Sequence, residues 1–221
     1  MSSPPLLVAD GVSKSFGATQ ALNGASLQVY PGEVLALTGP SGSGKSTLLH
    51  CLSGILDPDS GRVSFDGRDL GGLKDRERSA LRRGAFGFVF QFGQLVPELT
   101  CLENVALPLR LAGVRRRKAE RRAGDLLDRL EVTEVAGKRP GQASGGQGQR
   151  VAVARALVTG PRVIFADEPT GALDTRNGEQ VMRMLVAAVR ERGTAVVLVT
   201  HEEQIAAYAD RKVTCRDGVA R

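Results

Sequence analysis

The stretch G-P-S-G-S-G-K-S at residues 39–46 decides how this chain folds. It matches the pattern G-x-x-x-x-G-K-[ST], in which glycines let the backbone approach a phosphate and turn its N–H groups inward. The predicted strand E-V-L-A-L-T at residues 33–38 comes directly before it, and the helical pattern T-L-L-H-C-L-S-G comes directly after it. Because strand, loop and helix in this order form a phosphate-binding loop, the sequence predicts such a loop, with a helix beginning near Lys45.

Each part of this loop has a predicted chemical role. Lys45 places a positive charge near the β- and γ-phosphates of a nucleotide, and Ser46 offers an oxygen to Mg²⁺. The N-terminus of the following helix adds its positive dipole end. The predicted nucleotide-binding residues of the loop are Gly39, Pro40, Ser41, Gly42, Ser43, Gly44, Lys45, Ser46 and Thr47.

A pair of acids follows a second apolar strand. The run V-I-F-A at residues 163–166 leads into Asp167 and Glu168. Ligands of α/β proteins bind at the carboxyl ends of parallel strands. From there Asp167 can hold Mg²⁺ through water, and Glu168 can orient an attacking water or accept its proton. We therefore expect Asp167 near the metal and Glu168 as the catalytic carboxylate.

The rest of the chain alternates between short strands and helices. Turn pairs such as Pro31-Gly32 and Asp66-Gly67 separate the strands of the first third. Strands are predicted at residues 6–12, 25–30, 33–38, 62–65, 86–90, 163–166 and 194–200, and helices from about 119 and at about 175–192 and 202–207. The predicted fold class is α/β, with parallel strands covered on both faces, an antiparallel β portion before them and a helical insertion.

Composition excludes several classes of protein. The chain has 221 residues, of which 42% are hydrophobic, so general disorder is excluded. Its apolar runs are far shorter than the ~20 residues of a membrane helix, and its N-terminal stretch has no long apolar segment, so a secretory signal is not expected. Cys51, Cys101 and Cys215 form no C-x-x-C pair, which favours a reducing compartment over a disulfide framework or zinc site.

The net charge of +6 comes from one segment. Residues 110–122 contain seven basic residues and one acid, and the rest of the chain is balanced. A solvated helix face is one interpretation. The other is that Arg115, Arg116, Arg117 and Lys118 lie near anionic lipid headgroups or an acidic loop of a membrane partner. We expect no nucleic-acid partner, because the predicted phosphate-binding site lies elsewhere in the chain.

With these motifs in view, the chain resembles the nucleotide-binding ATPase subunits of ABC transporters over essentially its whole length. The most specific mark is S-G-G-Q within A-S-G-G-Q-G-Q-R, which is similar to the signature motif that other phosphate-loop NTPases lack. Ala143 stands where leucine is usual, and Gly148 replaces a bulkier polar residue. The signature residues implied by the resemblance are Ser144, Gly145, Gly146 and Gln147.

Other elements of the family follow in order along the chain. Phe16 matches the aromatic residue that stacks on adenine, and Gln91 matches the Q-loop glutamine, which reaches Mg²⁺ and reports to the membrane partner. G-A-L-D, which ends at Asp174, matches the D-loop, and His201 matches the switch histidine near the γ-phosphate. The resemblance thus implies a catalytic set of Glu168, His201 and Gln91, and a metal set of Ser46, Gln91 and Asp167.

The resemblance also implies a fold and a mechanism. The fold is a RecA-like P-loop NTPase core with an antiparallel β subdomain and an inserted α-helical subdomain, in one domain of residues 1–221. The core and β subdomain span 1–92 and 159–221, and the helical subdomain spans about 93–158. The expected cofactors are ATP and Mg²⁺. Two subunits, identical or paralogous, dimerise head-to-tail so that the signature of one covers ATP held by the other. Closure then drives either export or mechanotransmission by separate membrane permease subunits.

Two classes of ABC protein are weighed, membrane-complex ATPases and soluble ATPases that act on nucleic acid or ribosomes. Ser144 follows Gln91 by only 53 positions, which leaves no room for the coiled coil of chromosome or repair ATPases, so we favour the first class. Q-F-G-Q-L-V-P-E-L-T and A-D-E-P-T-G-A-L-D resemble the macrolide-export and lipoprotein-release group, with a cell-division-type ATPase as the alternative. We expect a cytoplasmic protein, peripheral at the inner face of the cell membrane through a permease.

Overall fold

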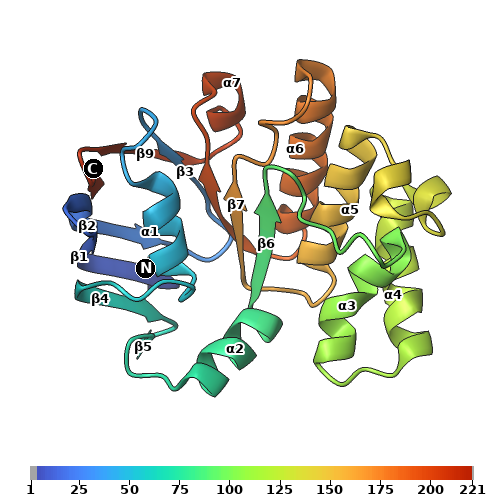
Figure 1. Ribbon diagram of the computed structural model, residues 1–221, viewed down its shortest axis with the longest axis horizontal. Helices are drawn as coiled ribbons and strands as arrows, with labels where there is room; N and C mark the ends of the chain where they lie inside the picture. Colours follow the sequence, from blue (N-terminus) through green and yellow to red (C-terminus); the bar gives the residue numbers. More distant parts are fainter. Residues whose placement is uncertain (1–3, 221) are drawn as a thin grey trace. The chain divides into compact units, whose positions relative to one another are not determined.

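The computed structural model describes residues 4–220 and has two compact units (Figure 1). We call Met1–Arg82 with Gly193–Arg221 the first unit, and Arg83–Arg192 the second unit. Residues 1–3, which open the N-terminal stretch considered above, and residue 221 lie outside the described part. Among residues 4–220, no helix has both the length and the apolar character that crossing a membrane requires.

The first unit contains an antiparallel sheet formed by the first third of the chain. Its strands are β1 (Leu7–Phe16), β2 (Thr19–Val29), β4 (Ser60–Phe65) and β5 (Arg68–Asp69), in the order β2-β1-β4-β5. Leu7 stands opposite both Val29 and Phe65, and all three side chains are buried. The predicted antiparallel portion is therefore confirmed, although β1 ends later, and β2 begins earlier, than predicted.

Parallel strands follow in the same unit. β3 (Val34–Thr38) lies between β8 (Ala195–Val199) and β9 (Arg211–Arg216) and runs parallel to both, while β10 (Val219–Ala220) pairs antiparallel with β9. β3 and β8 are apolar and almost wholly buried, as expected of strands covered on both faces. β9 and β10 are absent from the prediction, although exposed and buried residues alternate in R-K-V-T-C-R, which is typical of a half-buried strand.

The helices of the first unit differ in how many apolar residues they bury. α1 (Lys45–Leu52) begins where predicted and packs against β1, β2, β4 and β8 through Leu48, Leu49 and Leu52. α7 (Glu203–Ala206) is a short turn of helix after β8. α2 (Asp75–Gly84) is absent from the prediction because it buries no residue and therefore has no apolar stripe.

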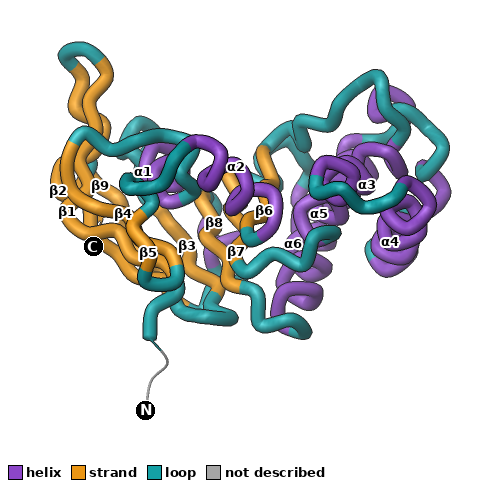
Figure 2. The backbone as a smooth tube through the Cα atoms, turned by 90° about the horizontal axis from the view of Figure 1, so that it is seen from below, coloured by secondary structure: helices purple, strands orange, loops and turns teal. Residues whose placement is uncertain are grey.

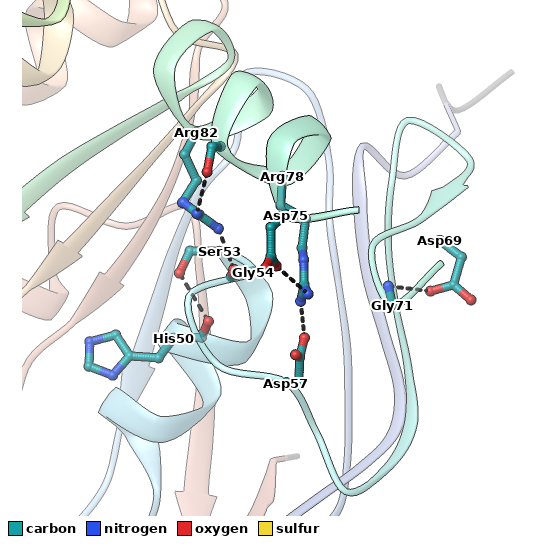
Figure 3. A network of polar contacts seen from close by, with 10 residues as sticks. His50, Ser53, Gly54, Asp57, Asp69, Gly71, Asp75, Arg78 and Arg82 are labelled. Carbon is teal, nitrogen blue, oxygen red and sulfur yellow. Dashed lines mark hydrogen bonds and ion pairs between the residues drawn. The ribbon is translucent and has the colours of Figure 1, made fainter. Parts of the chain in front are cut away.

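α2 buries no residue, and hydrogen bonds and ion pairs connect it to the rest of the first unit (Figure 3). Arg78 pairs with Asp57 and, at 3.0 Å, with Asp75. Arg82 donates from Nη1 to the carbonyl oxygen of Gly54 at 2.6 Å. Since Gly54 and Asp57 belong to the segment that follows α1, two guanidinium groups fasten α2 to that segment.

The second unit joins parallel strands to a group of helices, which Figure 2 shows in purple. Its elements are β6 (Phe86–Phe90), β7 (Val163–Asp167), α3 (Cys101–Leu111), α4 (Arg116–Arg129), α5 (Gly145–Leu157) and α6 (Thr175–Arg190), with 3₁₀ turns at Thr133–Val135 and Pro140–Gln142. The rings of Phe86 and Phe88 lie 5.1 and 5.6 Å from that of Phe165 between centroids. α5 packs so closely on β6 that a Cβ on Gly87 would lie 2.5 Å from the carbonyl oxygen of Ala156.

These elements confirm the predicted α/β class, and β6 matches its prediction at both ends. α6 ends at Arg190, two residues before the predicted end. The subdomain limits 1–92, 93–158 and 159–221 stay a prediction. The two compact units divide the chain at other residues, because β6, β7 and α6 belong with the helices of the second unit.

Candidate functional site

The predicted phosphate-binding loop connects β3 to α1 in the first unit. Gly39 and Gly44 have φ angles of +133° and +97°. A Cβ on Gly39 would lie 2.1 Å from the carbonyl oxygen of Cys215, and one on Gly44 would lie 2.3 Å from that of Ala21. Because an L side chain fits neither these angles nor this space, both positions require glycine.

Lys45 folds back onto the loop that precedes it. Its side chain is buried, and Nζ donates to the carbonyl oxygens of Gly39 at 2.9 Å and Pro40 at 2.7 Å. These contacts hold the ammonium group at the beginning of α1, where the helix dipole is positive. A cation there is unfavourable for the helix alone and favourable beside a bound anion, so the position of Lys45 fits a phosphate ligand.

Two further features of the loop leave hydrogen-bonding groups for a ligand. No side chain caps α1, whose N-cap is Gly44. Ser43 Oγ is buried, and within residues 4–220 it has no hydrogen-bond partner. A buried hydroxyl without a partner is costly unless a ligand supplies one. Together with the ammonium group of Lys45, these groups fit the phosphates of a nucleotide.

The buried thiol of Cys215 contacts the phosphate-binding loop. Cys215 Sγ donates to the carbonyl oxygen of Ser43 at 3.3 Å. Burial raises the pKa of the Cys215 thiol, so the thiol keeps the proton that it donates.

His201 and Phe16 lie in the same unit as this loop. Leu37 stands opposite Val199 in the parallel pairing, so β3 and β8 end at one edge of their sheet. His201, which is exposed and follows β8 by two residues, is therefore at the edge where the loop leaves β3. Phe16 ends β1 and is 53% exposed, with Lys14 Nζ 6.0 Å from its ring centroid. An exposed ring face is what stacking on adenine requires.

The predicted acids and the Q-loop glutamine come together in the second unit. Phe90, the last residue of β6, stands opposite Asp167, the last residue of β7, so Gln91 and Glu168 follow at the same sheet edge. Gln91 lies against Gly171, where a Cβ would be 2.8 Å from Gln91 Nε2. Glu168 has a φ of +47°, a strained conformation for a residue with a side chain that is often found at active sites.

The predicted signature begins α5 with a capping box. Ser144 Oγ accepts from the N–H of Gln147 at 3.3 Å, and Gln147 Oε1 accepts from the N–H of Ser144 at 2.8 Å. Gln147 Nε2 donates to Glu134 Oε1 at 2.9 Å. Hydrogen bonds from the backbone N–H of Glu134 and from Gln147 lower the pKa of the Glu134 carboxyl. The box uses the N–H groups of Ser144 and Gln147 and does not use those of Gly145 and Gly146.

Asp174, at the end of the predicted D-loop, caps α6. Its carboxylate accepts from the N–H of Asn177 at 3.0 Å and from Asn177 Nδ2 at 2.6 Å, and these hydrogen bonds lower the pKa of Asp174. A Cβ on Gly146 would lie 3.1 Å from Asn177 Oδ1, and one on Gly145 would lie 3.4 Å from Leu173 Cδ2. The signature and the D-loop therefore lie side by side.

Two residues of α5 that are not among the predicted site residues contact the end of β6 and the loop after it. Gln149 Nε2 donates to the carbonyl oxygen of Phe90 at 2.9 Å. Arg155 donates to the carbonyl oxygens of Gly93 and Gln94 at 2.7 Å each. Polar residues within the mostly apolar helix Q-R-V-A-V-A-R-A-L are the sequence signal that indicates them, because buried polar groups need partners.

The structure thus brings the predicted site residues together in two sets. The first unit holds the phosphate-binding loop, Phe16 and His201, and the second unit holds Gln91, Asp167, Glu168, the signature and Asp174. Oxygen-bearing side chains such as Ser46, Gln91 and Asp167 have the chemistry that Mg²⁺ prefers. Within residues 4–220 no three His, Cys, Asp or Glu side chains gather as a metal cluster. Mg²⁺ in phosphate-binding sites commonly takes only one or two protein carboxylates beside the phosphates.

The chain is similar to a known protein family. Residues 22–171 match the protein family described as ABC transporter. The chain is 46% identical over 220 residues to the lipoprotein-releasing system ATP-binding protein LolD 2 of Caulobacter vibrioides, covering 98% of this chain and 96% of that protein. It is 44% identical to the macrolide export ATP-binding/permease protein MacB of Marinobacter nauticus, covering 99% of this chain and 34% of that protein.

A solved structure with a similar fold is a dimer. It is a post-hydrolysis state of the ATP-binding cassette MJ0796 bound to ADP and Pi. The likeness has a TM-score of 0.89 at 38% identity, and covers 97% of this chain and 96% of the other.

Proposed function

The chain belongs to the ABC transporter family, and on this premise we propose that it binds and hydrolyses ATP to drive a separate membrane permease. As a member of this family it is a nucleotide-binding ATPase subunit of a membrane transporter. The observation that carries the proposal is the phosphate-binding loop. There the buried ammonium group of Lys45, the uncapped start of α1 and the unpartnered Ser43 hydroxyl supply donors for phosphate.

In the proposed complex, Lys45 exchanges its two carbonyl partners for the β- and γ-phosphates of ATP. The main-chain N–H groups of residues 39–47 hold the same phosphates, and Phe16 stacks on the adenine. The residues that would hold Mg²⁺ are Ser46, Gln91 and Asp167. When bound, Mg²⁺ offsets the negative charge that develops on the phosphates during transfer.

Glu168 is the proposed catalytic carboxylate. It follows Asp167 at the carboxyl edge of β7, beside Gln91, where it can orient water and accept its proton. His201 is the proposed second group near the γ-phosphate. Gln91 is proposed to link this chemistry to the membrane partner.

A second subunit, identical or paralogous, is proposed to complete each site in a head-to-tail dimer. Ser144, Gly145, Gly146 and Gln147 of one subunit would cover the nucleotide of the other. Support comes from the start of α5, where Gly145 and Gly146 have N–H groups outside the capping box and the helix dipole is positive. The similar cassette MJ0796 is itself dimeric with ADP and Pi bound.

The membrane permease is proposed to contact the loop that follows β6, from Gln91 to about Glu98. Phe92 in this loop is 78% exposed, so its ring is accessible to a partner. The relatives named above belong to lipoprotein-releasing and macrolide-export systems, so we propose that this chain serves the same group. It would then lie in the cytoplasm, peripheral at the inner face of the cell membrane.

The Glu168→Gln variant tests this proposal. With the permease present, we expect ATP turnover to fall by about 10²–10⁴-fold, while ATP still binds and the variant forms an ATP-dependent dimer. Phosphate release and light scattering after size-exclusion chromatography measure the two effects. Glu179→Gln, which removes an acid paired with Arg183 on α6, is the control. Near-normal turnover of Glu168→Gln, or a failure to dimerise with ATP, would contradict the proposal.

A further inference from the structure

The turn that joins α3 to α4 (Figure 1) has no part in the mechanism above. We call residues 110–118 the hairpin tip. They read R-L-A-G-V-R-R-R-K and contain five cations and no acid. All of these residues except Val114 are exposed. The hairpin tip is therefore an exposed and strongly basic surface within the second unit.

Most of the charge of the hairpin tip has no partner among the residues that the structure describes. Arg116 pairs with Glu103 at 3.4 Å and with Glu120 at 2.6 Å. The other four cations make no ion pair with any residue that the structure describes. These cations are Arg110, Arg115, Arg117 and Lys118. Four exposed cations within nine residues thus remain available to a partner outside the chain.

The hairpin tip also begins α4 in a way that lowers the stability of that helix. Arg115 is the N-cap, and its guanidinium group, which has no acceptor atom, cannot cap the N–H groups of the first turn, which contains no acid. Cations there oppose the helix dipole, and Arg117–Arg121 and Lys118–Arg122 place like charges four residues apart. α3, in the same hairpin, begins instead with a complete capping box. A segment that breaks local rules without compensation inside the fold indicates a function.

Leu111 adds an apolar group among these cations. Its side chain is 63% exposed, and Ala112 beside it is exposed as well. Against the phosphates of a nucleic acid, the cations would be paired while Leu111 stayed in water. At a bilayer surface the cations meet anionic headgroups while leucine enters the acyl boundary. The hairpin tip also has no aromatic side chain on which bases could stack.

We propose that the hairpin tip binds the surface of membranes that contain anionic lipids. Arg110, Arg115, Arg117 and Lys118 contact the headgroups, and Leu111 enters between them. This contact needs neither ATP nor a permease, so it goes beyond the proposed function and stands or fails independently of it. It would hold the helical part of the second unit against the membrane.

Vesicle binding by the full chain, without nucleotide or permease, tests the proposal. The vesicles are phosphatidylcholine alone or phosphatidylcholine with phosphatidylglycerol, at low salt. We expect binding only to the anionic vesicles and weakening by added salt. The triple variant Arg115→Gln, Arg117→Gln, Lys118→Gln should bind about 100-fold more weakly. Since it removes cations from a helix N-terminus, we expect it to stay folded, with an unchanged circular dichroism spectrum.

A second triple variant, with the same change of net charge in and beside α2, is the matched control. Lys74→Gln, Arg76→Gln, Arg83→Gln removes three exposed cations in and beside α2 that form no ion pair with described residues, and should bind like the wild type. Leu111→Ser should bind about tenfold more weakly, whereas Ile55→Ser, at a residue 50% exposed in the first unit, should not.

Three results would overturn the proposal. The first is that the wild-type chain does not bind anionic vesicles. The second is that the two triple variants lose vesicle binding equally. The third is that the chain binds an acidic polypeptide or a nucleic acid but does not bind vesicles. ATPase activity of the Arg115, Arg117, Lys118 variant, measured with detergent-solubilised permease, should match the wild type. Failure of vesicle binding with normal ATPase activity would therefore reject this inference and leave the proposed function standing.

Discussion

Two glycine-rich stretches each begin a helix, and the two helix starts are built in opposite ways. α1, in the first unit, follows Gly44 in a left-handed conformation and has no side-chain cap. α5, in the second unit, follows Ser144, which forms a capping box with Gln147. The start of α1 therefore leaves capping to a ligand, whereas the start of α5 supplies its own cap.

This difference indicates that the two helix starts would contribute to nucleotide binding in different ways. Lys45 needs only to exchange two carbonyl contacts to meet a phosphate. α5 keeps its capping box and can add only the N–H groups of Gly145 and Gly146, so its contribution depends on a phosphate already held elsewhere. We expect changes at α1 to alter nucleotide binding by a single chain, and changes at α5 to alter nucleotide binding and hydrolysis only in the dimer.

The largest expected effect comes from adding one methyl group at each helix start. Gly44→Ala should lower the free energy of unfolding by about 3 kcal/mol, because it combines a left-handed conformation with a close contact to the Ala21 carbonyl. Gly145→Ala should change it by less than about 1 kcal/mol, because its neighbour is a leucine methyl group at 3.4 Å and alanine favours a helix. Urea unfolding measures both variants. Equal losses would show that the two starts are not built differently.

The next largest effect separates binding by one chain from activity of the dimer. Lys45→Ala should weaken ATP binding by roughly 30-fold, or about 2 kcal/mol, because it removes a charged donor to phosphate. Gln147→Ala should leave the ATP affinity of the single chain unchanged. Titration calorimetry on the isolated subunit makes the comparison, with Lys74→Ala, an exposed lysine on the segment before α2, as the control. An unchanged affinity for Lys45→Ala would remove the basis for assigning the phosphate site to α1.

Both helix starts could be predicted from the sequence because their requirements are local. Glycine at fixed spacing, a following lysine and a preceding apolar run are all visible in residues 33–46. Serine followed three residues later by glutamine is likewise the pattern of a capping box. The buried parallel strands could be predicted for a similar reason, because continuous apolar runs are typical of such strands.

Contacts between distant residues could not be predicted in this way. α2 has no apolar stripe, and its guanidinium contacts reach back more than twenty residues to the segment after α1. Arg155 meets carbonyl groups about sixty residues earlier in the chain. The link from Glu134 to Gln147 joins a 3₁₀ turn to a helix start. Hydrogen bonds of this kind leave no periodic pattern, so only the folded chain identifies the two partners of each.

A smaller effect is expected when the capping box of α5 is opened. Ser144→Ala should lower the free energy of unfolding by about 1 kcal/mol, the usual loss for a helix N-cap, and should also lower ATP turnover by the dimer. Thr100→Ala opens the matching capping box of α3, so it should cost similar stability and leave turnover unchanged. Urea unfolding and phosphate release distinguish the two variants. Equal turnover in both would mean that Ser144 serves only as a cap.

The smallest effect is expected at Glu134, which supports the start of α5 from outside the capping box. Hydrogen bonds from its own backbone N–H and from Gln147 lower the pKa of this carboxyl. A carboxyl with a pKa lowered by folding stabilises the protein above its ordinary pKa of ~4.3, and this contribution is lost as the pH falls through the lowered value. Glu134→Gln keeps an acceptor oxygen but cannot ionise, so its acid-unfolding curve should lack this part of the pH dependence, with turnover at neutral pH near that of the wild type. Glu134→Ala removes the acceptor and should lower turnover slightly at every pH. If all three proteins have the same acid-unfolding curve and the same turnover, Glu134 does not position Gln147, and the start of α5 depends on its capping box alone.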